Sequence, residues 1–584
     1  MKVANKSVQD WDQLGAMKRA QILKKFAQIA HAQQEETIAI MSRDAGKTVS
    51  EADPEVSEAI DFANYYALSA ISLDLERESS PVGVVVVVPP WNFPYAIPTG
   101  GICAALAAGN AVIFKSAPET VATSWHLVNQ LWKAGVPKNV LQFVSTQDNE
   151  VGQSLIANDG VNSVILTGGY STALLFSSWK NELNLLAETS GKNAMVLTAC
   201  CDIDVAVKDL VQSAFGHAGQ KCSAASLAII DKNIYENPNF IKQLTDAVKS
   251  LKVGPGYDYS TTVGPIIKNA EAGLQRAFTQ LDDGEEWLLK PEKLDQSGLL
   301  WSPGIKTGVK PGSWSHLNEW FGPVLAIMVS PNLQTSIKWQ NSTDFGLTAG
   351  IQSLDPVECE YWIENVEAGN LYVNRGVTGA IVNRQPFGGW KRSCVGATAK
   401  AGGANYVATL RNWNQMKHFL PMKEAANKWL KSTGGMAIDH TGLSVEQNIQ
   451  RYRQYKKGFL IRIESGTSKD ELDFLSWLKN DLGVITGLSS DSLIPRLANL
   501  VVESAEEFAQ HAIEFDRVRW LSAEVPPVYE LMKNGLSCDR RPITIRGEIE
   551  IARWFLEQSV SITQHRYGNT NAGPKPVCTG LQLQ

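Results

Sequence analysis

The chain has 584 residues, enough for roughly three or four domains with well-buried cores. Hydrophobic residues make up 44% and charged residues 20%, an ordinary globular composition that argues against intrinsic disorder. The 54 Lys and Arg against 60 Asp and Glu leave a net charge of −6. That balance does not favour nucleic acid or an anionic membrane as a partner, because both bind a concentrated basic surface.

Targeting segments, membrane spans and metal-binding patterns are not evident. Residues 1–13 are polar and mixed in charge, and the apolar stretch 82–88 is far shorter than the ~20 residues of a membrane-spanning helix. The eight cysteines are too sparse for a disulfide framework and form no CxxC pair, and the eight histidines form no HExxH motif. We therefore predict a soluble cytoplasmic protein without a metal centre.

The predicted elements begin with a helix and a buried strand. Ile22, Phe26 and Ile29 recur at helical spacing, and Gly46 lies where such a run should stop. A run of valines follows at 84–88 and ends at two prolines. A valine run without polar alternation is typical of a parallel strand that is covered on both faces.

Strands and helices then alternate. We expect strands at 111–114, 140–144 and 163–166, with helices at 120–134 and 150–157 between them. This alternation predicts an α/β fold with a doubly wound parallel sheet, in which ligands bind at the carboxyl ends of the strands. A second α/β region from 192 to 384 has a helix at 204–218 and a strand at 225–230. A connector at 412–433 leads to a strand at 459–463, and the tail from 569 should lack regular structure.

Four short segments could carry chemistry. No GxGxxG follows a predicted strand, and the Gly46-Lys47-Thr48 triplet lacks the earlier glycine of a phosphate loop. The Thr167-Gly168-Gly169 segment between a strand and a helix offers open backbone amides for a pyrophosphate, although such a pair is more often a simple turn.

The other three segments each have an ordinary interpretation as well. Cys222 follows a loop of small residues and Lys221, whose charge favours a thiolate, but a buried core thiol is the commoner case. Asn92 lies between prolines after the valine strand. It could be an ordinary turn residue, or its fixed carboxamide could donate a hydrogen bond to an oxyanion. Glu188 ends an apolar stretch; most glutamates are solvated, but burial would raise its pKa and suit a general base.

Together these segments resemble the aldehyde dehydrogenase superfamily over residues 1–413. The resemblance rests on motifs in a fixed order: 90–94 (PWNFP), 114–115 (FK), 167–168 (TG), 188–192 (ETSGK), 219–222 (GQKC), 319–323 (EWFGP), 372–374 (YVN) and 386–389 (PFGG). Within the superfamily, residues 219–224 and 378–390 are similar to the 1-pyrroline-5-carboxylate dehydrogenases, which oxidise L-glutamate γ-semialdehyde to glutamate in proline breakdown. Residues 557–561 and 565–569 resemble the carboxy-terminal region of PutA-type proline-utilisation enzymes.

The resemblance implies a role for each matching residue. Cys222 would be the nucleophile, and Lys221 and a nearby dinucleotide would lower its pKa. Asn92 and the Cys222 backbone N–H would hold the oxyanion. Glu188 would activate the water that hydrolyses the thioester. The implied cofactor is NAD, held by Lys115, Glu119, Thr167, Gly168, Gly169, Glu319 and Phe321. The implied substrate contacts are Ser223, Gly379, Ala380 and Phe387.

The resemblance also implies an aldehyde dehydrogenase fold with a Rossmann-like NAD-binding domain at 1–191 and a catalytic domain at 192–384. Residues 385–434 would return to the NAD-binding domain, and 435–584 would form an extra α/β module that covers the active-site tunnel or replaces an oligomer contact. Two departures bear on the cofactor: Gly169 replaces the usual serine, and Glu119 lies one position later than in many relatives. NAD is therefore favoured over NADP without being secured.

The resemblance leaves the wider context open. The chain starts about fifty residues late and has no proline dehydrogenase barrel, so a flavin-dependent proline dehydrogenase would be on a separate chain, or this is the distal part of a longer enzyme. We expect a homo-oligomer. Two alternatives remain: oxidation of another carboxylated aldehyde such as succinate semialdehyde, and a non-catalytic scaffold that docks to proline dehydrogenase.

Overall fold

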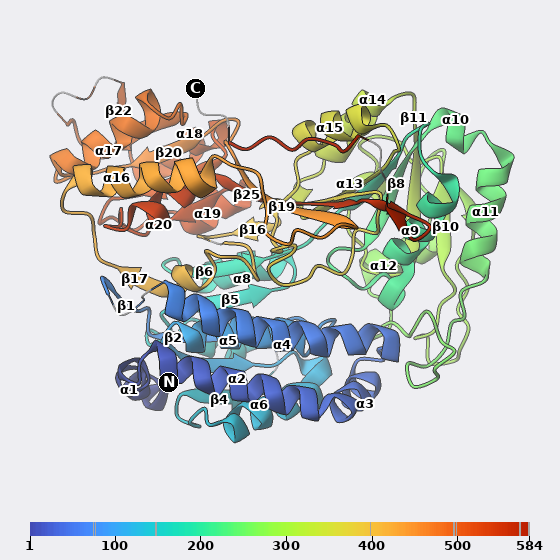
Figure 1. Ribbon diagram of the computed structural model, residues 1–584, viewed down its shortest axis with the longest axis horizontal. Coiled ribbons are helices and arrows are strands. Elements are labelled where there is room, and N and C mark those ends of the chain that lie inside the picture. The colour runs from blue at the N-terminus through green and yellow to red at the C-terminus, as the bar shows by residue number, and fades with distance from the viewer. Residues whose placement is uncertain are drawn as a thin grey trace.

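The computed structural model describes residues 1–73, 75, 77–146, 149–397, 399–494, 497, 499–570 and 574–581. Figure 1 shows three regions: an N-terminal domain in blue and cyan, a central domain in green and yellow, and a C-terminal region in orange and red. The α/β class that the alternating pattern predicts is confirmed, since each region is built on a sheet flanked by helices. Among the described residues, no helix has both the length and the apolar character needed to cross a bilayer.

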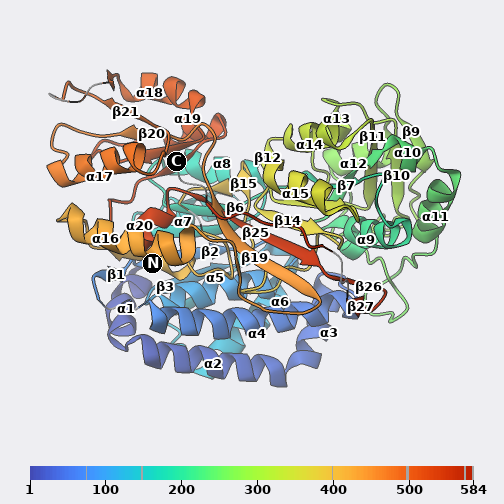
Figure 2. The ribbon, with the colours of Figure 1, turned by 45° about the horizontal axis from the view of Figure 1, so that its top comes forward.

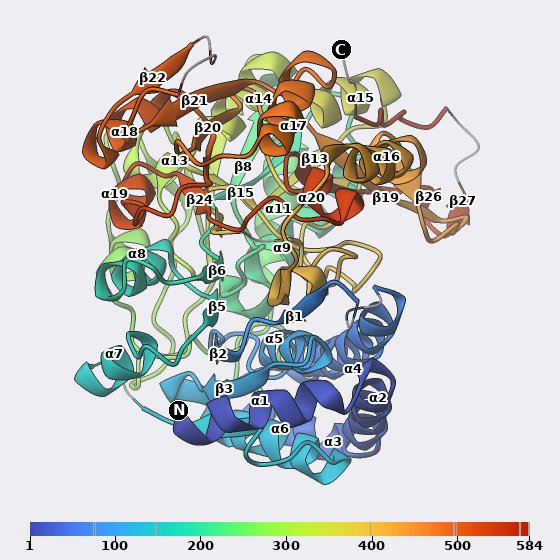
Figure 3. The same cartoon turned by 90° about the vertical axis from the view of Figure 1, so that its left-hand side faces the viewer.

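The N-terminal domain has a six-stranded sheet in the order β16-β6-β5-β2-β3-β4, parallel except for β16. Figure 3 shows β3, β2, β5 and β6 one above the other. Its strands are β2 (Val84–Val88), β3 (Ala111–Lys115), β4 (Leu141–Val144), β5 (Ser163–Thr167), β6 (Leu185–Glu188) and β16 (Cys394–Val395). Its helices are α1 (Lys2–Gln13), α2 (Ala16–Ala32), α3 (Gln34–Asp44), α4 (Val49–Ser72), α5 (Ala96–Ala107), α6 (Val121–Ala134), α7 (Glu150–Ile156) and α8 (Tyr170–Trp179), with the 3₁₀ helix η1 (Pro118–Thr120).

The valine strand β2 is buried along its whole length, as its sequence predicts. Val85 and Val87 pack into the core beneath α2, α4, α5 and α6, whereas Val84, Val86 and Val88 pack with residues of α7 and α8. Successive side chains of a strand point to opposite faces, so a strand that is covered on both sides needs apolar residues at every position.

The central domain has a ten-stranded sheet in the order β18-β19-β25-β14-β13-β7-β8-β11-β10-β9. Its strands are β7 (Asn193–Leu197), β8 (Ala225–Asp231), β9 (Glu286–Leu289), β10 (Gly304–Thr307), β11 (Val324–Ser330), β13 (Thr348–Gln352), β14 (Asn370–Val373), β18 (Ile438–Asp439), β19 (Glu446–Arg453) and β25 (Leu556–Thr563). Its helices are α9 (Ile203–Phe215), α10 (Lys232–Tyr235), α11 (Pro238–Lys249), α12 (Ala272–Thr279), α13 (Trp314–Leu317), α14 (Leu333–Asn341) and α15 (Pro356–Asn365), with η2 (Gly216–Gly219).

The C-terminal region contributes a parallel five-stranded sheet in the order β22-β21-β20-β23-β24. Its strands are β20 (Phe459–Arg462), β21 (Thr486–Ser490), β22 (Leu500–Val502), β23 (Arg517–Trp520) and β24 (Ser537–Asp539). Its helices are α16 (Phe419–Trp429), α17 (Lys469–Asn480), α18 (Ala505–His511), α19 (Val528–Lys533) and α20 (Gly547–Ala552), with η4 (Leu430–Gly434) and η5 (Ala512–Glu514).

Short strand pairs and one 3₁₀ helix complete the structure. They are β1 (Ser79–Pro81) with β17 (Arg411–Trp413), β12 (Phe345–Gly346) with β15 (Trp390–Lys391), β26 (His565–Arg566) with β27 (Asn569–Thr570), and η3 (Val407–Leu410). The chain after residue 434 contributes strands to both the five-stranded and the ten-stranded sheet. In the latter, β25 pairs with β14 of the central domain and β19 pairs with β25, and Figure 2 shows β19 and β25 as the two long orange and red arrows.

Three sequence predictions need correction. The expected connector at 412–433 contains helix α16, whose residues Phe419, Met422 and Ala426 pack into the C-terminal core. The helix predicted at 204–218 ends at Phe215, because His217 and Ala218 take left-handed φ values of 52° and 54°. The tail predicted to lack structure from 569 begins with the strand β27.

Candidate active site

Cys222 lies in a tight turn between helix α9 and strand β8. Gly219 in this turn has a φ of +68°, and a Cβ there would lie 2.3 Å from the carbonyl oxygen of Gly322. Only glycine allows both the backbone angle and the close approach. The carbonyl oxygen of Cys222 accepts a hydrogen bond of 2.6 Å from Asn193 Nδ2, which anchors the cysteine to strand β7.

The carboxamide of Asn92 is fixed beside this turn. Asn92 follows strand β2, and its Nδ2 donates a hydrogen bond of 2.9 Å to the carbonyl oxygen of Gln220. Lys47 Nζ donates a hydrogen bond of 2.9 Å to the carbonyl oxygen of Asn92. An amide nitrogen carries two protons, so the second N–H of Asn92 can serve as a donor to another group.

Glu188 is the last residue of strand β6, paired with Thr167 of β5 and Cys394 of β16. Burial raises the pKa of its carboxyl to about 8, and the charge of Lys400 opposes this shift. The prediction that an apolar setting raises the pKa of Glu188 is therefore confirmed. In its deprotonated form, a carboxyl group with such a pKa is a stronger base than a solvated carboxylate and can take a proton from water.

Two cavities meet at Cys222 and Glu188. The first encloses about 1260 Å³, part of it open to solvent, and Asn92, Glu188 and Cys222 all line it. Its wall also holds five of the predicted cofactor residues: Thr167, Gly168, Gly169, Glu319 and Phe321. The second has a volume of about 1120 Å³, again part of it open to solvent, and all four predicted substrate residues line it: Ser223, Gly379, Ala380 and Phe387. The structure therefore brings most of the predicted site residues around one sulfur atom.

The first cavity has features that suit a dinucleotide. Gly169 is the N-cap residue of helix α8, and a Cβ there would meet side-chain atoms no closer than 3.4 Å, so side chains do not crowd its backbone at the helix N-terminus. The Gly168 N–H is already used, because it donates a hydrogen bond of 3.1 Å to the carbonyl oxygen of Glu188. Glu319 accepts a hydrogen bond of 3.1 Å from the Gly191 N–H, and burial raises the pKa of its carboxyl to about 7. Phe321 packs edge-on against Trp91 with ring centroids 5.7 Å apart.

Two predicted cofactor residues are not among the described residues that line this cavity. Lys115 is the buried last residue of strand β3, and Glu119 is a half-buried residue of η1. Lys115 thus ends strand β3 at the carboxyl edge of the sheet, and Glu119 lies in the segment that follows.

The expectation that Lys221 lowers the pKa of Cys222 is wrong. Lys221 Nζ forms an ion pair of 2.5 Å with Glu51, so its charge is already balanced. Burial raises the pKa of the Cys222 thiol well above its usual value, and the nearby carboxyl groups of Glu188, Glu319 and Glu58 raise it further. The thiol form is therefore favoured until a positive charge enters the site.

Glu58, which none of the sequence motifs includes, lines the second cavity together with Cys222. Burial raises the pKa of its carboxyl to about 8, with a further contribution from Glu55, while Lys47 acts in the opposite direction. Glu58 belongs to helix α4 and follows Glu51 and Glu55 at helical spacing. That spacing of acidic residues in a helix with a buried face was the available signal.

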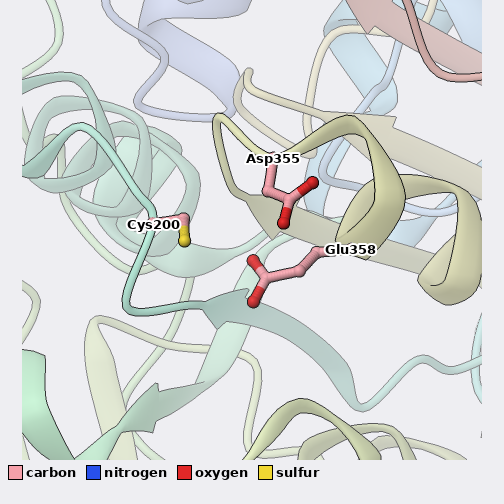
Figure 4. Close-up of side chains that lie close together, drawn as sticks. All are labelled: Cys200, Asp355 and Glu358. Atoms are coloured by element: carbon pink, nitrogen blue, oxygen red, sulfur yellow. The ribbon is translucent and has the colours of Figure 1, made fainter.

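Another group of side chains in the central domain offers atoms of the kind that bind metal ions. The side chains of Cys200, Asp355 and Glu358 converge there, as Figure 4 shows. Asp355 accepts a hydrogen bond from the Val357 N–H at the start of α15, and Glu358 accepts one of 2.6 Å from the Ser353 hydroxyl. These side chains thus have local structural roles.

The chain belongs to the aldehyde dehydrogenase family, whose sequence model matches residues 1–417. It is similar to 1-pyrroline-5-carboxylate dehydrogenase from Geobacillus sp. (strain WCH70), with 34% identity over 70% of this chain and 82% of that protein.

Solved structures give the same assignment. Proline utilization A (PutA) from Corynebacterium freiburgense is 41% identical, with a TM-score of 0.85, and the match covers 97% of this chain. The chain spans 59% of the length of that PutA. 1-Pyrroline-5-carboxylate dehydrogenase from Thermus with bound NAD is 30% identical, with a TM-score of 0.65, over 70% of this chain and 82% of the other.

Proposed function

We propose that this chain oxidises L-glutamate γ-semialdehyde, the open form of 1-pyrroline-5-carboxylate, to L-glutamate with NAD. The observation that carries the proposal is the meeting of two cavities at Cys222, one with a glycine at a helix N-terminus and one with groups for both ends of an amino acid. Related proteins named 1-pyrroline-5-carboxylate dehydrogenase, and one such structure that holds NAD, support the choice of substrate and cofactor.

The chemistry follows from three side chains. The Cys222 thiolate adds to the aldehyde carbon, and the oxyanion accepts hydrogen bonds from the Asn92 carboxamide and the Cys222 N–H. NAD, when bound, accepts the hydrogen of the aldehyde with its electron pair. The acyl group remains on Cys222 as a thioester, and Glu188 takes a proton from the water that hydrolyses it.

The second cavity offers a contact for each end of the substrate. The amides of Gly379 and Ala380, with the Ser223 hydroxyl, can donate hydrogen bonds to the α-carboxylate, and Phe387 can pack against the aliphatic chain. The carboxyl group of Glu58 can pair with the α-ammonium group. Its most prominent cationic neighbour, Lys47, is already paired with Glu55, so a bound ammonium would supply a counter-charge.

We infer that the cofactor is held by the first cavity and its surroundings. The Gly169 amide at the N-terminus of α8 suits the pyrophosphate, and Gly168, which has no side chain, leaves space beside it. Glu319 suits ribose hydroxyls, and Phe321 suits the nicotinamide ring. Thr167, Lys115 and Glu119 complete the proposed cofactor set. An acidic residue at 119 would disfavour the additional phosphate of NADP.

Glu58 also separates this substrate from succinate semialdehyde. That aldehyde has a carboxylate but no amine, so it would leave the buried Glu58 carboxyl group uncompensated. A scaffold that binds a proline dehydrogenase without chemistry of its own would have no use for Cys222, Asn92 and Glu188 in one cavity.

A panel of aldehydes with NAD and with NADP tests the proposal. We expect the highest kcat/KM for glutamate semialdehyde with NAD, with succinate semialdehyde and simple aliphatic aldehydes well below it. Equal values for glutamate and succinate semialdehydes would contradict the proposed substrate, and no NADH from any aldehyde would support the scaffold.

The wider setting is also proposed. The eight cysteines are free thiols, as a reducing cytoplasm requires. The similarity to PutA supports a functional link to a flavin-dependent proline dehydrogenase, whose product becomes the substrate here. A homo-oligomer is expected, and sedimentation of the purified chain would measure it.

A further inference from the structure

A buried ion pair lies directly behind Asn92. Lys47 Nζ and Glu55 Oε2 are 2.7 Å apart, and both side chains are fully buried. Removing two charges from water costs several kcal/mol per ion, which their attraction repays only with good geometry and further hydrogen bonds. A buried pair of this kind is weak evidence for stability alone, and its contacts point to another role.

The pair holds the segment that carries Asn92 at both ends. Lys47 donates its hydrogen bond to the Asn92 carbonyl oxygen, and its ammonium group lies 4.1 Å from the centre of the Phe93 ring. Glu55 Oε1 accepts hydrogen bonds of 2.8 Å and 3.1 Å from the N–H groups of Tyr95 and Ala96, where helix α5 begins. Residues 92–96 are thus fixed by two side chains that also fix each other.

Helix α4, which carries Glu55, also contacts the loop that carries the nucleophile. Glu51, one turn before Glu55 on α4, forms the ion pair with Lys221, next to Cys222. The Asn92 side chain itself donates to the carbonyl oxygen of Gln220. The N-terminal part of α4 therefore contacts both the segment that follows Asn92 and the cysteine turn, and can set the distance between them.

We propose that Lys47 and Glu55 are positioning residues for the oxyanion donor Asn92. Through the backbone of residues 92–96 they hold the Asn92 carboxamide where it meets the oxygen of the aldehyde after Cys222 attacks. This inference rests on the proposed function. It also gives a role to the Gly46-Lys47-Thr48 triplet, which lacks the pattern of a phosphate loop.

Glu55→Gln is the primary test. The variant keeps an oxygen for the Tyr95 and Ala96 N–H groups but leaves Lys47 without its counter-charge. Stopped-flow measurement with glutamate semialdehyde and NAD should show a burst of NADH slowed by about tenfold to 100-fold, as a displaced oxyanion donor would cause. Thioester hydrolysis should be slowed as well, because it passes through a second tetrahedral oxyanion at the same position. The Kd for NAD should stay within about twofold, because cofactor binding does not need the precise placement of Asn92.

A double-variant cycle shows whether Glu55 acts through Asn92. In an Asn92→Ala background, Glu55→Gln should change the burst rate by less than about threefold, since the donor that it positions is gone. If Glu55→Gln slowed the burst as much in this background as in the wild type, the proposal would be overturned.

Matched variants separate positioning from general stability. Asp12→Asn removes the carboxylate that pairs with buried Arg411 at 2.7 Å elsewhere in the same domain, and should lower the Tm without slowing the burst. Glu55→Asp should recover most of the burst rate. If Glu55→Gln does not fold, Lys47→Met replaces it in the cycle, with the same expected result.

The outcomes for the two proposals are distinct. A wild-type chain that forms no NADH from glutamate semialdehyde would contradict the proposed function. A fully active wild type with an unchanged burst in folded Glu55→Gln and Lys47→Met variants would contradict only the positioning role.

Discussion

Three carboxyl groups, those of Glu58, Glu188 and Glu319, surround the Cys222 thiol. Burial raises the pKa of Glu58 and of Glu188 to about 8, and that of Glu319 to about 7. Each charge that remains on them raises the pKa of the thiol. A cation that enters the cavities, such as a substrate ammonium group, would therefore favour both the carboxylates and the thiolate.

Thioester hydrolysis should depend on pH through Glu188. Only the deprotonated carboxylate can act as the base, so the hydrolysis rate should rise with pH through about 8 and level off above it. Single-turnover measurements on the preformed thioester between about pH 6 and 10 would follow this rise. A Glu188→Gln variant should lose it, and an unchanged profile in that variant would mean that another group is the base.

The same pKa predicts an effect on stability. A carboxyl group whose pKa rises from 4.5 to about 8 on folding contributes stability at low pH that is lost as the pH increases through that interval. Glu188→Gln removes the titrating group, so the variant does not lose this stability as the pH increases. Its Tm, relative to that of the wild type, should therefore increase from pH 5 to pH 9 in calorimetry; parallel curves would show that Glu188 is not buried as a charge at high pH.

Glu58→Gln tests the proposed ammonium contact. A hydrogen bond between charged groups contributes about 1.5–3 kcal/mol, so kcat/KM for glutamate semialdehyde should fall by about tenfold to 100-fold. The value for succinate semialdehyde, which has no amine, should not fall. Asp53→Asn, at an exposed position of the same helix, is the matched control and should change neither value.

At the scale of elements, two strands from the C-terminal region support the proposed substrate loop. The Ile381 N–H donates to Gln385 Oε1 at 2.9 Å. Gln385 Nε2 donates to Asn448 Oδ1 of β19 at 2.5 Å and to the Ser561 hydroxyl of β25 at 3.0 Å. The backbone amides of Gly379 and Ala380 therefore depend on side chains that lie far along the chain.

Asn448→Ala should loosen this loop. We expect KM for glutamate semialdehyde to rise by about threefold to tenfold, with kcat nearly unchanged, because a lost hydrogen bond of this kind costs about 1 kcal/mol. Steady-state kinetics would measure both constants. Gln447→Ala is the control, since adjacent side chains of β19 point to opposite faces, and an equal effect there would contradict the account.

The sequence predicts elements where local pattern decides the structure. The valine run gives β2 because burial on both faces demands apolar residues at each position. Local pattern does not predict η2, where tertiary contacts force His217 and Ala218 into left-handed backbone angles. It also fails at α16, whose short amphipathic pattern is weak until the C-terminal core packs against it.

The residues of the candidate site likewise divide into those that local pattern predicts and those that depend on tertiary packing. Asn92, Glu188 and Gly168 follow strands, and the topology of an α/β sheet brings such positions together at one edge. Glu58 belongs to a helix, and the spacing of Glu51, Glu55 and Glu58 is only a weak local signal that it differs from a solvated glutamate. Its importance depends on how α4 packs beside the cysteine turn, which is a property of the whole fold.

At the scale of the whole molecule, the ten-stranded sheet joins distant parts of the chain. Strand β14 at Asn370–Val373 pairs with residues 559–562 of β25, and β25 pairs with β19. Pairing over such separations follows no local sequence signal. As a consequence, β18, β19 and β25 of the C-terminal region extend the same sheet that contains β7 and β8, the strands next to the Cys222 turn.

The central claim is that Cys222 carries the acyl group between oxidation and hydrolysis. The most direct measurement uses Glu188→Gln, mixed with glutamate semialdehyde and NAD, quenched in acid, digested and analysed by peptide mass spectrometry. The account predicts one NADH per site and an acyl group on the peptide that contains Cys222. NADH formation with an unmodified Cys222, or an acyl group on a different cysteine, would contradict it.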